Sequence, residues 1–320
     1  MRIGMIGIGG IADVYRKALK EYAQPITAVC DINPARVQEI AAIEQCQGYT
    51  DYRDMLAKES LDAVFVSIPP GAHRDQVIDV VNAGAAIFVA KPIGLDIQLV
   101  ERTLAAITKA GVINQVGYMS RYSDMAAKAR ELMGNRKVVM GLGRFMVRMG
   151  ANHPWWGKRT IGGGQIVEQS THQFDFLRYI MGEVTEVHTY GHKGAGDDIA
   201  DFEDSTIVTL HFANGGIGSV ISTSCTDVPD GCGWEFTGRD LYLRMIMDVD
   251  LSGVIDGQAV SFKGSETGYI RQVGEFLQAV AQRDQSLVRS DYADAVKTLA
   301  VTMAAEQSLQ QGGQLIVMEG

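Results

Sequence analysis

A chain of 320 residues, 46% of them hydrophobic, is long enough to form two domains that each bury a core. Its 38 acidic residues outnumber its 29 basic ones, and the formal net charge of −9 gives no support for nucleic-acid binding. The four cysteines show no metal-binding spacing, which favours a reduced, cytoplasmic compartment, and no apolar run approaches the roughly 20 residues that span a membrane.

The first 31 residues carry the pattern of a dinucleotide-binding unit. An apolar strand at residues 2–6 leads into a turn at residues 7–12 with the sequence G-x-G-x-x-A, and a helix is expected at residues 13–22. A second strand at residues 26–30 ends at Asp31, which lies 19 residues after the turn. An acid at about this distance binds the ribose of a dinucleotide. The alternative is a glycine-rich turn that binds nothing.

The residues of the turn suit a bound pyrophosphate. Gly7 permits the tight turn, Gly9 lets the backbone approach the phosphates, and Ala12 lets the helix pack closely on the strand. The helix N-terminus offers unpaired N–H groups and the positive end of its dipole. Asp31 can accept hydrogen bonds from ribose hydroxyls and repels a 2′-phosphate, which favours NAD, whereas the nearby Arg36 keeps NADP possible. The other cofactor-binding candidates here are Gly10, Ile11 and Ile32.

Strands and helices continue to alternate up to residue 118. The run at residues 63–68 is apolar almost throughout, which is typical of a parallel strand buried on both faces. The alternation predicts an α/β dinucleotide-binding domain at residues 1–118, built on a doubly wound parallel sheet. Besides that run, helices are expected at residues 34–43, 51–57, 74–83 and 96–110, and strands at residues 86–90 and 112–118.

The pattern changes after residue 118. Strands with two-residue alternation follow, with a hairpin at Asn214-Gly215, and the helices stand apart from them. This arrangement predicts an α+β domain at residues 119–320 on a large, open, mostly antiparallel sheet, with one face free to pair with another subunit. Helices are expected at residues 125–133, 165–181, 269–283 and 292–311, a loop at residues 150–164, and strands at residues 137–148, 206–212, 217–223 and 314–317 and between residues 234 and 262.

Chemistry is expected where the parallel strands end, since open α/β sheets bind ligands beyond their carboxyl ends. Pro69 and Pro70 lack two backbone donors and suit a wall beside a flat nicotinamide, or else form a rigid turn. His73 lines the cofactor cleft or has a structural role. Lys91 directly follows an apolar strand and precedes Pro92, across a bond that can be cis, and both residues are candidates to bind the cofactor. Its ammonium can stabilise the alkoxide that forms as a hydride leaves a substrate; the alternative is a surface lysine.

The run Gly162-Gly163-Gly164 precedes a helix that carries acid and base groups. These glycines allow a sharp turn or a close approach of the backbone to a ligand. A histidine beside a carboxylate can take the proton of a substrate hydroxyl, which makes His172 and Glu168 catalytic candidates. The alternatives are a buried structural histidine beside a surface acid, or two metal ligands for which no third ligand is evident. Four residues share this face of the expected helix: Glu168, His172, Asp175 and Tyr179.

Taken together, these motifs resemble those of the glucose–fructose oxidoreductase, inositol 2-dehydrogenase and rhizopine-catabolism (Gfo/Idh/MocA) oxidoreductases over essentially the whole chain. The resemblance implies a Rossmann domain and an α/β domain with an open, mostly antiparallel sheet, through which dimers or tetramers assemble. It also implies reversible hydride transfer between nicotinamide and a carbinol of a sugar, cyclitol or related compound. The motifs are Gly7-x-Gly9-x-x-Ala12, Pro69-Pro70-x-x-His73, Lys91-Pro92, and the glycine run leading to Glu168-x-x-x-His172-x-x-Asp175.

The resemblance also implies roles for single residues. Lys91 corresponds to the family lysine that polarises the reacting oxygen, and His172 to the acid/base. Glu168 stands where many members have the shorter aspartate, so its reach differs. Ala90 replaces the glutamate that usually precedes Lys-Pro, which removes a polar contact in the cofactor cleft. Further substrate-binding candidates, of which the tryptophans can instead be core or subunit contacts, are Arg121, Tyr122, Asn152, His153, Trp155, Trp156 and Arg159.

The sequence thus predicts an NAD(P)-dependent dehydrogenase that acts on a hydroxyl of a sugar, sugar derivative or cyclitol, with no nucleic-acid or membrane partner and a homodimeric or homotetrameric assembly. One alternative is a glycosidase or epimerase that reduces and regenerates its bound NAD in each cycle. The other is a non-catalytic regulator that binds NAD or a sugar on the same scaffold. The presence of both Lys91 and His172 speaks against the regulator, since it has no need of the pair.

Overall fold

The computed structural model describes residues 1–148, 155–194, 200–265 and 267–318. Contacts divide the chain into two compact units, Met1–Met119 with Tyr269–Ala295 and Ser120–Gly268 with Val296–Gly320. The sequence predicts a second domain that runs without interruption from residue 119, whereas the structure groups residues 269–295 with the first unit. The physical reason is helix α9 (Gly268–Gln282), because its residues Val273, Phe276 and Leu277 are buried in the core of that unit.

In the described part of the first unit, six parallel strands form a sheet in the order β3-β2-β1-β4-β5-β6. This is the strand order of dinucleotide-binding folds, and it reverses between β1 and β4. The predicted doubly wound sheet is confirmed, although β3 is too short for a sequence pattern to reveal it. The strands are β1 (Ile3–Ile6), β2 (Ile26–Cys30), β3 (Gln47–Tyr49), β4 (Ala63–Val66), β5 (Ala86–Val89) and β6 (Asn114–Val116).

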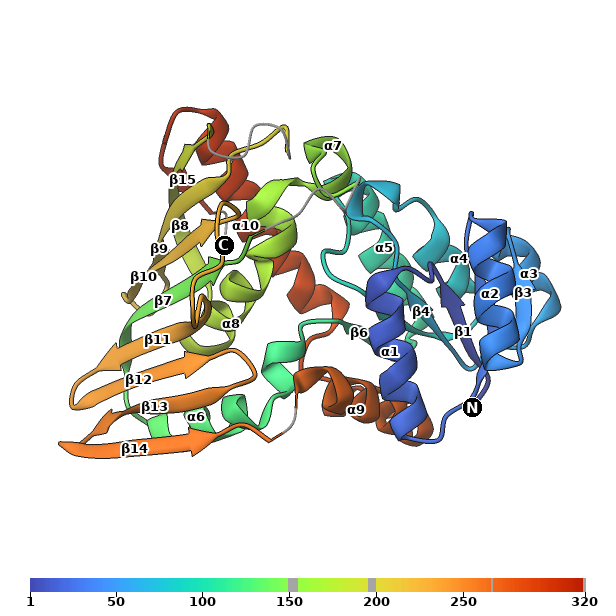
Figure 1. Cartoon of the computed structure of the whole chain (residues 1–320), viewed down its shortest axis with the longest axis horizontal. Helices are drawn as coiled ribbons and strands as arrows, with labels where there is room; N and C mark the ends of the chain where they lie inside the picture. Colours follow the sequence, from blue (N-terminus) through green and yellow to red (C-terminus); the bar gives the residue numbers. More distant parts are fainter. Residues whose placement is uncertain (149–154, 195–199, 266, 319–320) are drawn as a thin grey trace. The chain divides into compact units, whose positions relative to one another are not determined.

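Helices cover both faces of this sheet (Figure 1). Strands β4 and β5 are buried along their whole length, as apolar runs in a covered parallel sheet should be. A cluster of aromatic rings fills the centre of one face, with neighbouring ring centroids 4.8–5.9 Å apart: Tyr15, Phe65, Phe88 and Phe276. Besides α9, the helices of this unit are α1 (Gly10–Glu21), α2 (Pro34–Glu44), α3 (Tyr52–Lys58), α4 (Gln76–Asn82) and α5 (Ile97–Ala110).

In the second unit, the described residues form a sheet of nine strands in the order β14-β13-β12-β11-β7-β10-β9-β8-β15. Neighbouring strands are antiparallel except β7 and β10, which are parallel, so the predicted mostly antiparallel sheet is confirmed. The sequence pattern did not predict β8, because a register shift after Val184 breaks the alternation of its side chains. The strands are β7 (Val138–Met146), β8 (Val184–His192), β9 (Ser205–Phe212), β10 (Ile217–Thr223), β11 (Cys232–Gly238), β12 (Leu241–Ile246), β13 (Asp250–Ile255), β14 (Gln258–Lys263) and β15 (Ile316–Val317).

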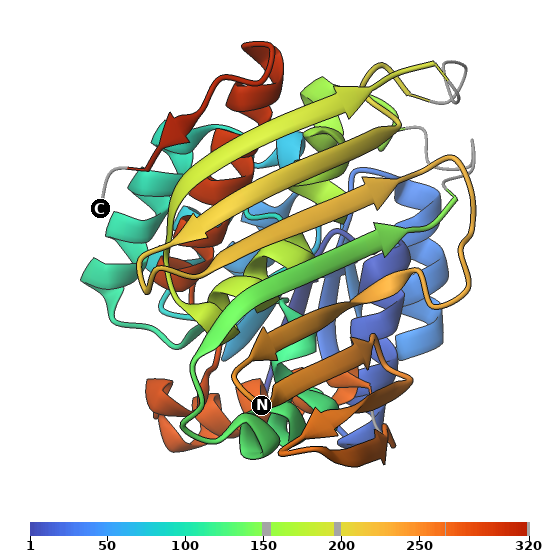
Figure 2. The same cartoon turned by 90° about the vertical axis from the view of Figure 1, so that its left-hand side faces the viewer.

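The two faces of this second sheet differ. Helices α6 (Asp124–Met133) and α8 (Thr171–Met181) and the later part of α10 (Tyr292–Gln310) pack on one face, over a core that includes Phe174 and Trp234. Figure 2 shows the opposite face, in front of which no helix of the drawn residues passes. Side chains on that face, 37–63% exposed, include Tyr190, Ile207, Ile217, Tyr242 and Val254.

Candidate cofactor and active site

The glycine turn joins β1 to α1. Gly7 has a φ of 80°, and a Cβ there would lie 2.3 Å from the carbonyl oxygen of Ser67, so only glycine fits. At Gly9, no atom of the described residues beyond its immediate chain neighbours lies within 4 Å of the position that a Cβ would take, so the backbone is open on that side. No described side chain caps α1, which leaves the N–H groups of its first turn for an anion. These features fit a bound pyrophosphate.

Asp31 follows β2 and holds the glycine turn in place. Its Oδ2 accepts a hydrogen bond from the Ile8 N–H at 3.0 Å, and its Oδ1 accepts one from the Asn33 N–H at 2.9 Å. The side chain stays partly exposed, while the neighbouring Ile32 is 93% exposed. The carboxylate is thus oriented at the end of β2, where a ribose-binding acid is expected.

Arg36 lies on α2 and makes an ion pair with Asp13 of α1. Asp13 belongs to none of the motifs that predict the site. Its place in the first turn of a helix, three residues before Arg16, is the signal that could have revealed an ion pair, and the structure contains that pair as well.

The segment at residues 69–73 follows β4 and begins with a 3-10 turn, Pro70–Ala72. His73 is 4% exposed, and its Nε2 has no hydrogen-bond partner among the described residues. Burial, together with the nearby charge of Arg74, lowers the pKa of His73 to about 4. The imidazole is therefore neutral at physiological pH, with a ring nitrogen available to a ligand or water.

Lys91 lies at the same edge of the first sheet. Because β1, β4 and β5 are parallel neighbours, the residues that follow them emerge together. Lys91 comes two residues after β5, is partly buried, and is joined to Pro92 by a cis peptide bond. A Cβ on Gly94 would lie 3.9 Å from the Cβ of His73, so this loop adjoins the segment at residues 69–73. The first unit thus brings the glycine turn, His73 and Lys91 to one edge.

Glu168 and His172 belong to the second unit. The single helix expected at residues 165–181 is instead a π-helical turn, Gln165–Gln169, followed by α8. Gly163 and Gly164, with φ of 89° and 86°, make the sharp turn into it. The π-helical turn shifts the helical phase between Glu168 and His172, so a constant helical spacing does not describe their placement. His172 is 6% exposed and Glu168 is partly buried.

Asp175, which shares the predicted face with His172, makes a buried ion pair with Arg121. Nε and Nη2 of Arg121 donate to the two carboxylate oxygens at 2.8 and 2.6 Å, and the two side chains are 4% and 1% exposed. Thr298 of α10 donates to the same carboxylate at 3.1 Å. Tyr122 is fully buried. Both Arg121 and Tyr122 are buried within this unit. Their contacts with a substrate stay predictions.

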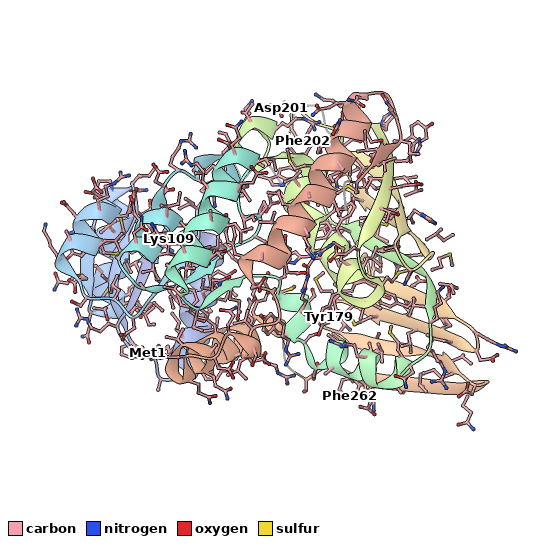
Figure 3. All side chains as sticks on the ribbon, turned by 180° about the vertical axis from the view of Figure 1, so that it is seen from behind. Met1, Lys109, Tyr179, Asp201, Phe202 and Phe262 are labelled. Carbon is pink, nitrogen blue, oxygen red and sulfur yellow. The ribbon has the colours of Figure 1, made fainter. Side chains whose placement is uncertain are left out.

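The remaining substrate candidates lie near α7 (Arg159–Gly162). Trp156 is 2% exposed and packs edge-on against Phe202, with ring centroids 5.0 Å apart, whereas Trp155 is partly exposed. Arg159 makes ion pairs with Glu203 and Glu306. Figure 3 shows Asp201 and Phe202 beside this helix, and the backbone N–H of Arg159 donates to the Asp201 carboxylate at 2.7 Å. Asn152 and His153 lie outside the described residues.

We expect Glu306 to make the stability of the protein depend on pH. Burial raises the pKa of Glu306 from 4.5 to about 7, although Arg159 opposes the rise. Because the folded protein then binds a proton more tightly than the unfolded chain, this group's contribution to stability is complete below pH 4.5 and is lost as the pH rises through 7. We expect the free energy of unfolding, measured in urea between those pH values, to fall less steeply in Glu306→Gln than in wild type.

The matched control for this prediction is Glu21→Gln, which changes an exposed carboxyl group on α1 and should leave the slope of the free energy against pH as it is in wild type. An equal slope in wild type and Glu306→Gln would contradict the prediction.

None of the helices in the described part of the chain combines the length and apolar composition that a membrane crossing requires. In the same residues, no three His, Cys, Asp or Glu side chains are grouped as a metal site would need.

Both units match known family models. Residues 1–118 match a family described as an oxidoreductase family with an NAD-binding Rossmann fold, and residues 136–244 match the GFO/IDH/MocA C-terminal domain. The uncharacterized oxidoreductase YrbE of Bacillus subtilis is 30% identical over 69% of this chain and 66% of its own length. The myo-inositol 2-dehydrogenase of Thermotoga maritima is 29% identical over 69% of this chain and 67% of its own length.

Solved structures share the fold over nearly the full chain. The WlbA dehydrogenase from Bordetella pertussis, in complex with NADH and UDP-GlcNAcA, has a TM-score of 0.85 at 22% identity and covers 100% of this chain and 99% of its own. A levoglucosan dehydrogenase in complex with NADH and levoglucosan has a TM-score of 0.88 at 17% identity, with 100% of both chains covered. Identities this low establish the fold alone.

Proposed function

Because this chain belongs to the GFO/IDH/MocA family of oxidoreductases, with an NAD-binding Rossmann fold at residues 1–118, we propose that it transfers a hydride between NAD and a hydroxyl-bearing carbon of a sugar, sugar derivative or cyclitol. The family and the cofactor predicted from the sequence are thereby confirmed. The observation that carries the proposal is the edge of the first sheet, where the glycine turn, His73 and Lys91 meet. It supports a reactive amine beside a nucleotide site.

In this proposal, Lys91 and His172 both act on the substrate oxygen, in different roles. Lys91 donates a hydrogen bond to the hydroxyl oxygen and stabilises the negative charge that develops there. His172 accepts the hydroxyl proton, and Glu168 helps to orient the substrate and the imidazole. NAD, when bound, supplies the hydride acceptor. The hydroxyl oxygen thus loses its proton to His172 and the carbon that bears it loses a hydride to NAD, which together convert the carbinol to a carbonyl.

The environment of His73 supports the choice of His172 as the base. A group whose pKa is about 4 holds a proton too weakly at neutral pH to accept one from an alcohol efficiently. His73 can still hydrogen-bond a ligand through its buried Nε2. We therefore propose that His73 contacts the cofactor and takes no part in proton transfer.

The substrate class rests on the relatives. The Thermotoga maritima protein is named for myo-inositol, and one solved relative binds levoglucosan. Both are compact rings with several hydroxyl groups, which agrees with the sugar or cyclitol expected from the sequence. A screen of sugars and cyclitols with NAD and NADP in parallel, followed by the absorbance of the reduced cofactor, tests this proposal. We expect net formation of NADH with at least one member of the panel.

The other outcomes of the screen separate the alternative functions. Loss of substrate without net NADH would favour a glycosidase or epimerase that regenerates its cofactor in each cycle. Binding of a sugar without any turnover would favour a non-catalytic regulator. Either outcome would contradict the dehydrogenase.

We also propose that the uncovered face of the second sheet packs against a second copy of the chain, in a homodimer or homotetramer. Tyr190, Ile207 and Ile221 are paired across β8, β9 and β10 in one row, and Ile217 lies on the same face. Ile207 is 55% exposed and Tyr190 is 63% exposed in the single chain. Apolar side chains that adjoin one another on an open sheet are typical of an interface.

The variant Ile207→Lys should shift the protein toward the monomer, because it places a charge in the centre of this apolar row. The molar mass, measured by light scattering after gel filtration, should fall relative to wild type. The matched control is Ile43→Lys, which changes an isoleucine of α2 that is 60% exposed and belongs to the first unit. A monomeric wild type, or an unchanged mass for Ile207→Lys, would contradict the proposed interface.

A further inference from the structure

Arg36 is linked to Asp31, the proposed ribose-binding acid, through hydrogen bonds to Ile8 of the glycine turn. Its Nε donates to the carbonyl oxygen of Ile8 at 2.9 Å, and the N–H of Ile8 donates to Asp31. The guanidinium of Arg36 and the carboxylate of Asp31 therefore bind opposite ends of one residue in the glycine turn. An arginine in this place is a candidate to bind the 2′-phosphate of NADP.

The other nitrogens of this guanidinium already have anionic partners. Nη2 donates to both carboxylate oxygens of Asp13 at 2.7 and 2.8 Å, and Nη1 donates to Glu39 at 3.0 Å. The pair with Asp13 is the more sheltered, since the Asp13 side chain is 38% exposed and that of Glu39 is 55% exposed. A 2′-phosphate would have to displace Asp13 before it could use Arg36.

The charges around Arg36 also disfavour a second phosphate. Asp13 accepts a further hydrogen bond from Arg16 at 2.6 Å, and Arg16 in turn pairs with Glu44. Within the described residues of this network, three carboxylates face two guanidinium groups, which leaves one negative charge in excess. Asp31 adds another negative charge next to it. The network therefore repels a dianion while offering it no unpaired arginine.

We infer that Asp13 is a specificity-determining residue: by holding Arg36, it keeps the cofactor preference on NAD in addition to the direct effect of Asp31. This inference rests on the NAD-binding fold and is independent of Lys91, His172 and the substrate. Asp13 acts through Arg36, so its removal should improve the binding of NADP more than that of NAD. Without Arg36, its removal should have no such selective effect.

The test is a titration of purified protein with NADH and NADPH, with dissociation constants read from cofactor fluorescence. In Asp13→Asn, the ratio of the NADPH constant to the NADH constant should fall about tenfold, which is the scale of one charge-assisted hydrogen bond. The double variant Asp13→Asn/Arg36→Met should return the ratio to near its wild-type value. Thermal unfolding without cofactor shows that each variant is folded.

Glu44→Gln is the matched control, because it removes one negative charge from the same network without touching Arg36. An equal fall in the ratio for Glu44→Gln and Asp13→Asn would attribute the preference to net charge and overturn the inference. Retention of the gain in the double variant, or an unchanged ratio in Asp13→Asn, would overturn it too. The NADH constant of wild type tests the cofactor site itself, so failure of the proposed function is seen separately.

Discussion

Replacing Lys91 with methionine should lower the turnover number about 10²- to 10³-fold, the range seen when one donor to a developing oxyanion is removed. Methionine keeps much of the length and the apolar stem of lysine but carries no charge and no N–H group. The developing alkoxide then has no cation beside it, while the glycine turn and Asp31, which we expect to bind the nucleotide, are unchanged. The dissociation constant of NADH should therefore stay close to that of wild type.

Lys109→Met is the control for this experiment. Lys109 is an exposed residue in the last turn of α5, labelled in Figure 3, and its replacement should leave both turnover and cofactor binding unchanged. Turnover of Lys91→Met at the wild-type rate would remove Lys91 from the mechanism. An altered NADH constant with normal turnover would assign it to cofactor binding alone.

The first sheet could be predicted from the sequence because its strands are local patterns. A run such as residues 63–68 predicts a buried parallel strand without knowledge of its neighbours, and the glycine spacing predicts the tight turn before the helix. The assignment of α9 to the first unit could not be predicted in this way. It depends on Phe276 packing against Phe65 and Phe88, which lie about two hundred residues earlier in the chain.

In the candidate site too, local patterns predicted some residues, whereas contacts between distant residues could not be predicted. Position at the end of a strand pointed to Lys91 and Asp31, since topology alone brings strand ends to one edge. The partners of the charged residues were hidden, because the pairing of Arg121 with Asp175 spans 54 positions and follows no period. A helical pattern also could not reveal the π-helical turn before His172, whose residues differ from those of an α-helix by no evident sequence signal.

The change of His172 to asparagine should lower kcat/KM for the oxidation of the alcohol about 10²- to 10⁴-fold, which is the usual contribution of a positioned base. Asparagine can still donate a hydrogen bond, but it cannot accept and hold the hydroxyl proton. A base works only when it is unprotonated, so kcat/KM of wild type should rise with pH. In His172→Asn that rise should disappear, and NADH binding should be retained.

The shape of the pH profile separates catalysis from structure. A variant that only loosens α8 would lose activity at every pH and keep the rise, whereas loss of the base removes the rise itself. Lys109→Met is again the control, because Lys109 is an exposed residue of α5 outside the proposed interface and the candidate site, and its change should leave the profile intact. If His172→Asn keeps the pH-dependent rise, another group takes the proton. Glu168→Gln is then the variant to measure next, since Glu168 is a partly buried carboxylate on the π-helical turn, four residues before His172.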